Sequence, residues 1–95
     1  MKTVSYFREA EDEITDALLA SRKAAEFRQT IDDALRDIAN GTVTHARIAN
    51  SSGRRCILPR PDPYSIVYLE ADTDIQVVAF QHHKRRANYW KNRLP

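Results

Sequence analysis

The sequence YSIVYLEADTDIQVVAFQHH, residues 64–83, contains the two segments that decide the fold. Residues 64–70 and 74–81 are rich in valine, isoleucine, tyrosine and phenylalanine, which favour β-strands. The short polar stretch Ala71-Asp72-Thr73 between them is typical of a hairpin turn. We therefore predict two adjacent antiparallel strands.

The second of these segments is apolar on both sides. Alternation along a strand puts Ile75, Val77 and Ala79 on one face and Val78 and Phe80 on the other. A strand that is buried on both faces lies inside a sheet more often than at its edge. We expect this segment to be a central strand.

Residues 8–40 contain no glycine or proline and show two apolar stripes at helical spacing. The stripes consist of Ala10, Ile14, Ala17 and Leu18, and of Phe27, Ile31, Ala34, Leu35 and Ile38. At 100° per residue, one continuous helix would turn the second stripe by roughly 100° from the first. A break near residues 21–23 removes this conflict. We predict a helical hairpin, 8–20 and 22–39, with Ser21 as N-cap of the second helix and Asn40-Gly41 as its C-terminal signal.

The remaining segments supply further strands and loops. Residues 2–7 and 54–58 are predicted strands, and residues 43–48 alternate well enough for a short edge strand. Residues 59–63 contain three prolines and form a stiff loop, whereas residues 88–92 could form one helical turn.

The order of these elements indicates an α+β fold of a single domain, residues 1–95. We expect a small antiparallel-rich sheet of about four strands, in the order β-α-α-β-β-β, with the helical hairpin packed on one face.

Charge is distributed unevenly along the 95 residues, although the net charge is only +2. Residues 1–44 hold six basic and nine acidic side chains, and residues 45–95 hold nine basic and four acidic ones. A basic half attracts phosphate or an acidic protein, or is simply a solvated face. The single cysteine excludes an intrachain disulfide, and there is no leader or membrane segment, so we expect a cytoplasmic protein.

Candidate groups for RNA chemistry follow the last predicted strand. His82 or His83 could act as an acid or a base, Arg85 and Arg86 could clamp a phosphate, and Tyr89 could stack on a base or donate a proton. Adjacent histidines on a strand point to opposite faces, so only one can face a given site.

The sequence predicts neither a metal site nor a cofactor. His45, Cys56 and the histidine pair lack the spacing of metal ligands. Cys56 lies in a strand-like segment and is expected in the core. Trp90 is expected to anchor the C-terminal tail on the sheet, and Tyr64 and Tyr68 are expected in the core.

Several segments in order carry a resemblance to a known family. They are residues 4–10 with Glu13, Ile14 and Ala17; Phe27, Ile31, Ala34 and Ile38; and residues 63–68, 75–79, 82–86 and 89–93. The chain resembles the RelE/ParE superfamily of toxins from type II toxin–antitoxin modules, which includes the plasmid stabilisation family. It is more similar to the ParE-like than to the RelE-like members. It departs from the family at residues 22–25, where members often have a glycine, and at Asp62, where members often have phenylalanine.

The resemblance implies one of two targets. ParE-like members inhibit DNA gyrase without a known catalytic centre, whereas RelE-like members are ribosome-dependent endonucleases that cleave mRNA. Both kinds are neutralised by a cognate antitoxin, and operator DNA is bound only through the antitoxin complex. We expect a growth-arresting toxin that inhibits gyrase. The alternative is an mRNA interferase of the RelE type, with His83, Arg85 and Tyr89 as catalytic residues.

Basic side chains are the candidate contacts to the target or to nucleic acid under either reading. They are Arg54, Arg55, Arg60, Arg85, Arg86, Lys91 and Arg93. A plain nucleic-acid-binding domain is a third hypothesis, because the C-terminal half is basic. However, the sequence contains no recognition-helix or base-stacking motif.

Overall fold

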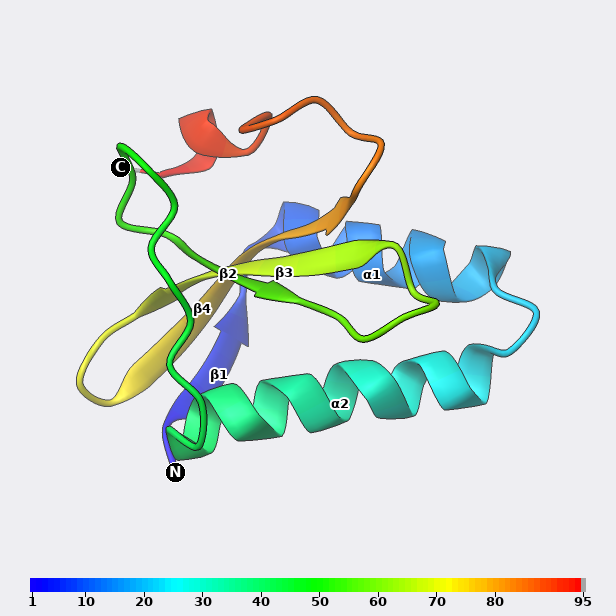
Figure 1. Cartoon of the computed structure of the whole chain (residues 1–95), viewed down its shortest axis with the longest axis horizontal. Coiled ribbons are helices and arrows are strands. Elements are labelled where there is room, and N and C mark those ends of the chain that lie inside the picture. The colour runs from blue at the N-terminus through cyan, green and yellow to red at the C-terminus, as the bar shows by residue number, and fades with distance from the viewer. Residues whose placement is uncertain (95) are drawn as a thin grey trace.

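The computed structural model describes residues 1–94 and places the predicted hairpin at the centre of a four-stranded sheet (Figure 1). The hairpin consists of β3 (Tyr64–Glu70) and β4 (Asp74–His82), which pair antiparallel. β1 (Thr3–Tyr6) pairs parallel with β4, and β2 (Arg54–Ile57) pairs antiparallel with β3. The sheet order is β1-β4-β3-β2, so β4 is a central strand, as its apolar faces predicted.

A bulge in β4 changes which of its side chains share a face. Val67 pairs with Ala79, but the next residue, Tyr68, pairs with Val77, so Val78 is an extra residue on β4. Phe80 therefore packs with Ile75 and Val77 on one face, while Val78 and Ala79 pack on the other. The prediction that Ala79 lies with Ile75 and Val77, and Phe80 with Val78, is wrong because strict alternation does not allow for the bulge.

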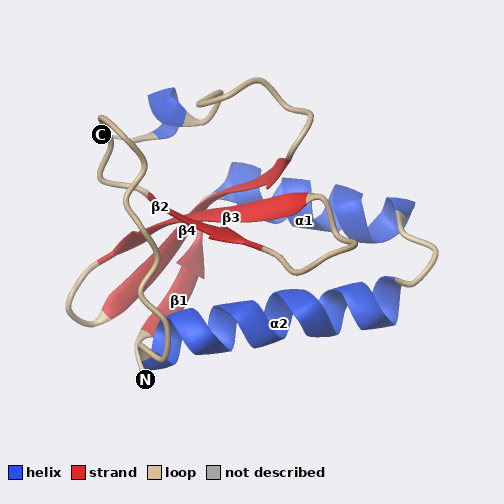
Figure 2. Cartoon of the chain, viewed as in Figure 1, coloured by secondary structure: helices blue, strands red, loops and turns tan. Residues whose placement is uncertain are grey.

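The predicted helical hairpin is confirmed, with α1 (Arg8–Ala20) and α2 (Ala24–Asn40) running antiparallel (Figure 2). The second helix begins two residues later than predicted, and its N-cap position is Lys23, not Ser21. The Ser21 hydroxyl instead accepts a hydrogen bond from the Lys23 backbone N–H within the turn. Gly41 ends α2 with a φ of 70°, a left-handed conformation that glycine adopts without steric cost.

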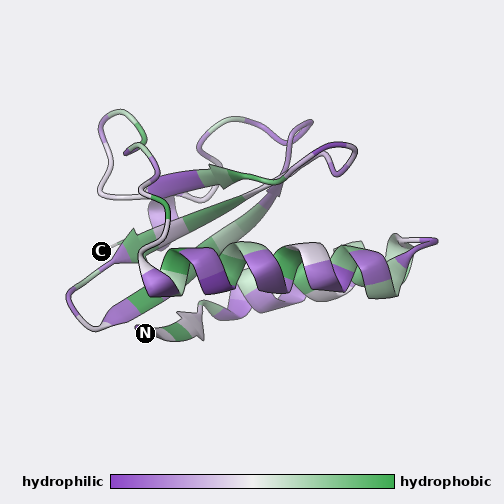
Figure 3. Ribbon diagram, turned by 60° about the horizontal axis from the view of Figure 1, so that its bottom comes forward, coloured by the Kyte–Doolittle hydropathy of each residue, from purple (hydrophilic) through white to green (hydrophobic). Residues whose placement is uncertain are grey.

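Both helices pack on the same face of the sheet, where they form the larger core. Figure 3 shows apolar positions alternating with polar ones along the helices. The apolar stripes meet the sheet through residues that are almost completely buried: Ala10, Ile14, Phe27, Ile31, Ile38, Ile66, Tyr68, Ile75, Val77 and Phe80. This helix-side core also contains Cys56, as predicted.

The C-terminal tail, residues 83–94, covers part of the opposite face. Trp90 is completely buried there and packs with Val67, Val78 and Ala79. Its predicted role as the anchor of the tail is confirmed. The helical turn expected at residues 88–92 is a short 3₁₀ helix, η1 (Lys91–Arg93).

The connection between α2 and β2 forms no full strand. Within it, only Arg47 makes a bridge, to Arg54, so the possible edge strand at residues 43–48 is absent. The proline-rich segment 59–63 is a loop, as expected. Neither helix of the described residues has the length and apolar character that crossing a membrane requires.

Truncation of two strand isoleucines tests this assignment of the core. Ile75→Ala should lower the free energy of unfolding by about 2–5 kcal/mol, because the side chain is completely buried under the helices. Ile57→Ala is the matched control: that side chain is 65% exposed, so its loss should change stability by about 0.5 kcal/mol or less. Equilibrium urea denaturation measures both, and equal effects would contradict the packing described.

Candidate functional site

The edge of β4 is open beyond the point where β1 ends. The Phe7 backbone N–H donates to the Val77 carbonyl at 2.8 Å, and the chain then leaves the sheet to begin α1. Further along β4, side chains instead of a strand bind its free backbone groups. The Phe80 N–H donates to the Glu13 carboxylate at 3.1 Å, and the Val78 carbonyl accepts from the Arg93 guanidinium at 3.0 Å. Two charged groups therefore take the place of a neighbouring strand.

Glu13 also binds the C-terminal tail directly. The guanidinium of Arg93 donates two hydrogen bonds to its carboxylate, at 3.0 and 3.2 Å, and the Tyr89 hydroxyl donates a third. The Glu13 and Arg93 side chains are only 16% and 14% exposed. A two-pronged arginine–carboxylate contact of this kind fixes orientation as well as distance. We call Glu13, Tyr89 and Arg93 the tail clamp.

The clamp favours the charged form of Glu13. Burial alone would raise the pKa of this carboxyl group, but the hydrogen bonds from Arg93, Tyr89 and Phe80 and the charge of Arg93 outweigh burial. The net effect is a pKa below the ordinary value of 4.5. The carboxylate is therefore ionised at neutral pH and holds its partners.

Tyr89 is held in a form that disfavours proton transfer. Burial, followed by the hydrogen bond to Glu13 and the negative charge of that carboxylate, raises the pKa of the phenol above its ordinary value of 10.0. The guanidinium of Arg85 lies 3.9 Å from the ring centre, so this face of the ring is covered. The hydroxyl already donates to Glu13. Tyr89 is consequently a structural residue in this conformation.

The two histidines point to opposite faces, as predicted. The His82 ring meets Tyr64 edge-on on the helix side, and its Nδ1 accepts the backbone N–H of Lys84. His83 is exposed, and its Nε2 shares a hydrogen bond of 3.0 Å with the Ser65 hydroxyl. Arg85 lies against the Tyr89 ring, whereas the hydrogen bond of the His83 ring is to Ser65. Within residues 1–94, no hydrogen bond or ring contact joins His83 to Arg85 or Tyr89, the other two residues expected in an interferase site.

The predicted basic contact residues divide into those that pair with groups of this chain and those that do not. Arg54 donates to the His45 carbonyl at 2.6 Å and lies 3.6 Å from the Glu70 carboxylate, and Arg93 is part of the clamp. Arg85 lies 4.0 Å from Glu13. Among the seven predicted contact residues, three are exposed and form no ion pair within residues 1–94: Arg60, Arg86 and Lys91. These three predicted residues are available to a partner.

Arg55 is a separate case, because it is half-buried and lacks a carboxylate within the described part of the chain. One terminal nitrogen is 3.4 Å from the Gln81 amide oxygen, which also accepts from the Trp90 indole N–H at 3.2 Å. The Arg55 Nε is buried without a hydrogen-bond partner among these residues. A buried polar atom without a partner is uncommon and marks a candidate contact point.

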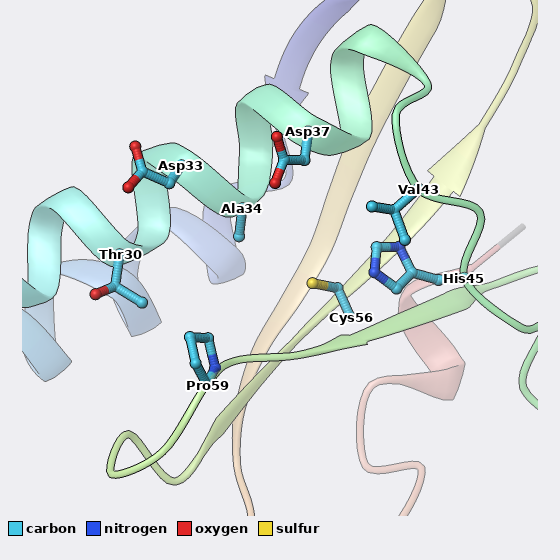
Figure 4. A pocket seen from close by; sticks show the side chains of 8 residues that line it. All are labelled: Thr30, Asp33, Ala34, Asp37, Val43, His45, Cys56 and Pro59. Carbon is cyan, nitrogen blue, oxygen red and sulfur yellow. The ribbon is translucent and has the colours of Figure 1, made fainter.

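A cleft lies between α2 and β2, and its lining includes Val43 and His45 on one side and Pro59 on the other (Figure 4). Cys56 lines it, and burial, followed by the negative charge of Asp37, raises the pKa of its thiol to about 11. The thiol is therefore protonated and a poor nucleophile at neutral pH. No group of three or more metal-ligating side chains is found within residues 1–94.

Sequence reasoning did not find the role of Glu13. It placed this residue only among those that carry the family resemblance. A usable signal is its position beside Ala10, Ile14 and Ala17, because a carboxylate on the border of a buried stripe needs a partner. The partner lies 80 residues away along the chain, which no local pattern can indicate.

Replacement of Glu13 by its uncharged isostere tests the clamp. Glu13→Gln should lower the free energy of unfolding by about 1–3 kcal/mol, because the largely buried Arg93 side chain is left without its counter-ion. The control Glu11→Gln removes an exposed acid of the same helix and should change stability by about 0.5 kcal/mol or less. Urea denaturation gives the energies, and Trp90 fluorescence reports whether the tail is released.

The depressed pKa of Glu13 predicts a particular dependence on pH. Because the folded-state pKa lies below 4.5, the stabilisation by this carboxylate is complete above about pH 4.5 and is lost as the pH falls through the folded-state pKa. The difference in unfolding free energy between wild type and Glu13→Gln should therefore be constant from pH 7 to about pH 5 and shrink below it. A difference that grows on acidification would rule out this account.

Comparison with known proteins supports the fold and gives no sequence relative. No family model matches the sequence, and no curated protein matches it. A chain from the chromosomal ParDE toxin–antitoxin system of P. aeruginosa superposes with a TM-score of 0.67, at 17% identity, covering 86% of this chain and 96% of that one. A copper-bound mutant toxin from Helicobacter pylori superposes with a TM-score of 0.64, at 13% identity, covering 87% and 96%. The chain thus has the fold of the ParE/RelE-type toxins.

Proposed function

We propose that this protein is the toxin of a type II toxin–antitoxin module, that it arrests growth by inhibiting DNA gyrase, and that a cognate antitoxin neutralises it. The fold supports the proposal, because it matches a chain of a ParDE system and a second toxin over almost the whole length of each. Fold alone does not select the target, so the site must supply that argument.

The state of Tyr89 is the observation that favours an inhibitor over a nuclease. Cleavage of RNA requires a base for the 2′-hydroxyl and an acid for the leaving oxygen, close to each other. Here the Tyr89 hydroxyl donates a hydrogen bond to Glu13, and the His83 ring is hydrogen-bonded to Ser65. A surface that acts by binding needs no such pair.

The tail provides the surface that we assign to gyrase. Arg86 and Lys91 are exposed and form no ion pair with any described residue, and they flank the clamped and buried residues Tyr89 and Trp90. The clamp holds these two cations in a fixed position, which lowers the entropy that binding would otherwise lose. We infer that Arg86 and Lys91 contact an acidic surface of the target.

A ribosome-dependent mRNA interferase is the second candidate. It is favoured by Arg55, a guanidinium without a counter-ion among the described residues, and by the exposed His83. Primer extension on translated mRNA tests it, since new 5′ ends that disappear in His83→Ala would support the interferase and contradict the gyrase proposal.

Supercoiling by purified gyrase tests the first candidate. The wild-type protein should inhibit the reaction, and the double variant Arg86→Ala/Lys91→Ala should require an about tenfold higher concentration, because two exposed charge contacts are lost. The matched control Arg22→Ala/Lys23→Ala removes the same charge from the turn between the helices and should inhibit as the wild type does. Full supercoiling activity at a large excess of the wild-type protein would refute the proposed target.

A further inference from the structure

A groove that the function above does not use lies on the tail side of the sheet, beside the C-terminal tail. It has a volume of about 440 Å³ and is lined by Arg47, Ile48, Arg55, Ile57, Ala87 and Asn88. This volume falls within the range of about 300–1,000 Å³ that is typical of ligand sites. The connection before β2 forms one wall and the tail forms the other.

The cations of the groove have no counter-ion within the described residues. No carboxylate within residues 1–94 lies within ion-pair distance of Arg47 or Arg55. Gln81 anchors Arg55 by one nitrogen, and the Nε atom has no hydrogen-bond partner among the described residues. A guanidinium held in place in this way favours an anionic ligand, and carboxylate and phosphate both match its geometry.

The other lining residues decide between these two anions. Ile57 is 65% exposed, although it lies in a strand, and Ile48 and Ala87 extend the aliphatic surface around it. None of the lining residues is aromatic, because Trp90 is completely buried and Tyr89 is held by the clamp. Single-stranded nucleic acid is normally bound by stacking on aromatic rings, whereas an aliphatic surface beside arginines suits a peptide that is both acidic and apolar.

We propose that this groove binds an acidic–aliphatic segment of the antitoxin, with a carboxylate on Arg55 and an apolar side chain on Ile57. The identity of the partner rests on the proposed function, but the chemistry of the groove does not. Ala87 and Asn88 belong to the tail and directly follow Arg86. A segment in the groove therefore lies against the surface assigned to gyrase, and its presence there hinders access to Arg86.

Binding of defined probes to the full-length protein tests the proposal. The probe is a fluorescein-labelled octapeptide of alternating leucine and glutamate, with alternating leucine and lysine as the charge control and an oligouridylate of equal length as the phosphate control. Fluorescence anisotropy should show binding of the leucine–glutamate peptide. Arg55→Gln should weaken it about tenfold and Ile57→Ser about fivefold, because one removes the charge contact and the other the apolar one.

Two control variants outside the groove test whether the peptide binds there or merely to exposed charged and apolar side chains elsewhere. Arg36→Gln removes an exposed arginine from α2, and Leu19→Ser removes a leucine that is 81% exposed on α1. Both should bind the peptide as the wild type does. Trp90 fluorescence shows that the tail remains in place in each variant.

The possible outcomes are decisive in both directions. Peptide binding that depends on Arg55 and Ile57, but not on Arg36 or Leu19, supports the proposal. Binding that Arg55→Gln leaves unchanged, or Arg55-dependent binding of the oligouridylate without binding of the peptide, overturns it. Arg55-dependent peptide binding by a protein that does not inhibit gyrase supports the groove assignment and refutes only the proposed target.

Discussion

The contact between the Glu13 carboxylate and the end of β4 joins α1, the sheet and the C-terminal tail. β1 is too short to cover β4, so Phe80 and Val78 present a backbone donor and acceptor that need partners. Glu13 from α1 binds the donor, and Arg93 from the tail binds the acceptor while pairing with Glu13. Helix, sheet and tail are thereby fixed by one carboxylate, and the clamp also covers part of an open sheet edge, which otherwise invites association.

This contact pairs only some of the basic residues of the tail with an acid of the N-terminal half. One acid of the acidic N-terminal half neutralises Arg93 and attracts Arg85. Arg86 and Lys91, a few residues away, form no ion pair within residues 1–94. The tail thus has an inner set of bound groups, which set its position, and an outer set of free cations. This division separates the residues that hold the tail in place from exposed cations that the sequence alone does not distinguish from them.

Local patterns were sufficient for the elements and insufficient for the site. The two stripes of residues 8–40 predicted the helical hairpin because a continuous helix would separate them in angle. Two features depended on information that no local window contains. The bulge at Val78 reverses the faces of Ala79 and Phe80, because the pairing of β4 with β3 overrides simple alternation. The Glu13–Arg93 contact depends on the register of the whole sheet, so residue types alone grouped Tyr89 with His83 and not with Glu13.

The two faces of the sheet differ in how completely they are covered. This difference leaves the groups that we propose for binding on the tail side. The helical hairpin covers one face and buries its aliphatic side chains almost fully. On the other face, the tail buries Val67, Val78 and Ala79 under Trp90 but does not reach Ile57. An exposed isoleucine gains nothing for the isolated chain, and an arginine with a buried, unpartnered nitrogen lowers its stability. Both features become favourable when a partner with carboxylate and aliphatic groups covers them, and this is why we propose the incompletely covered side of the sheet as the binding surface.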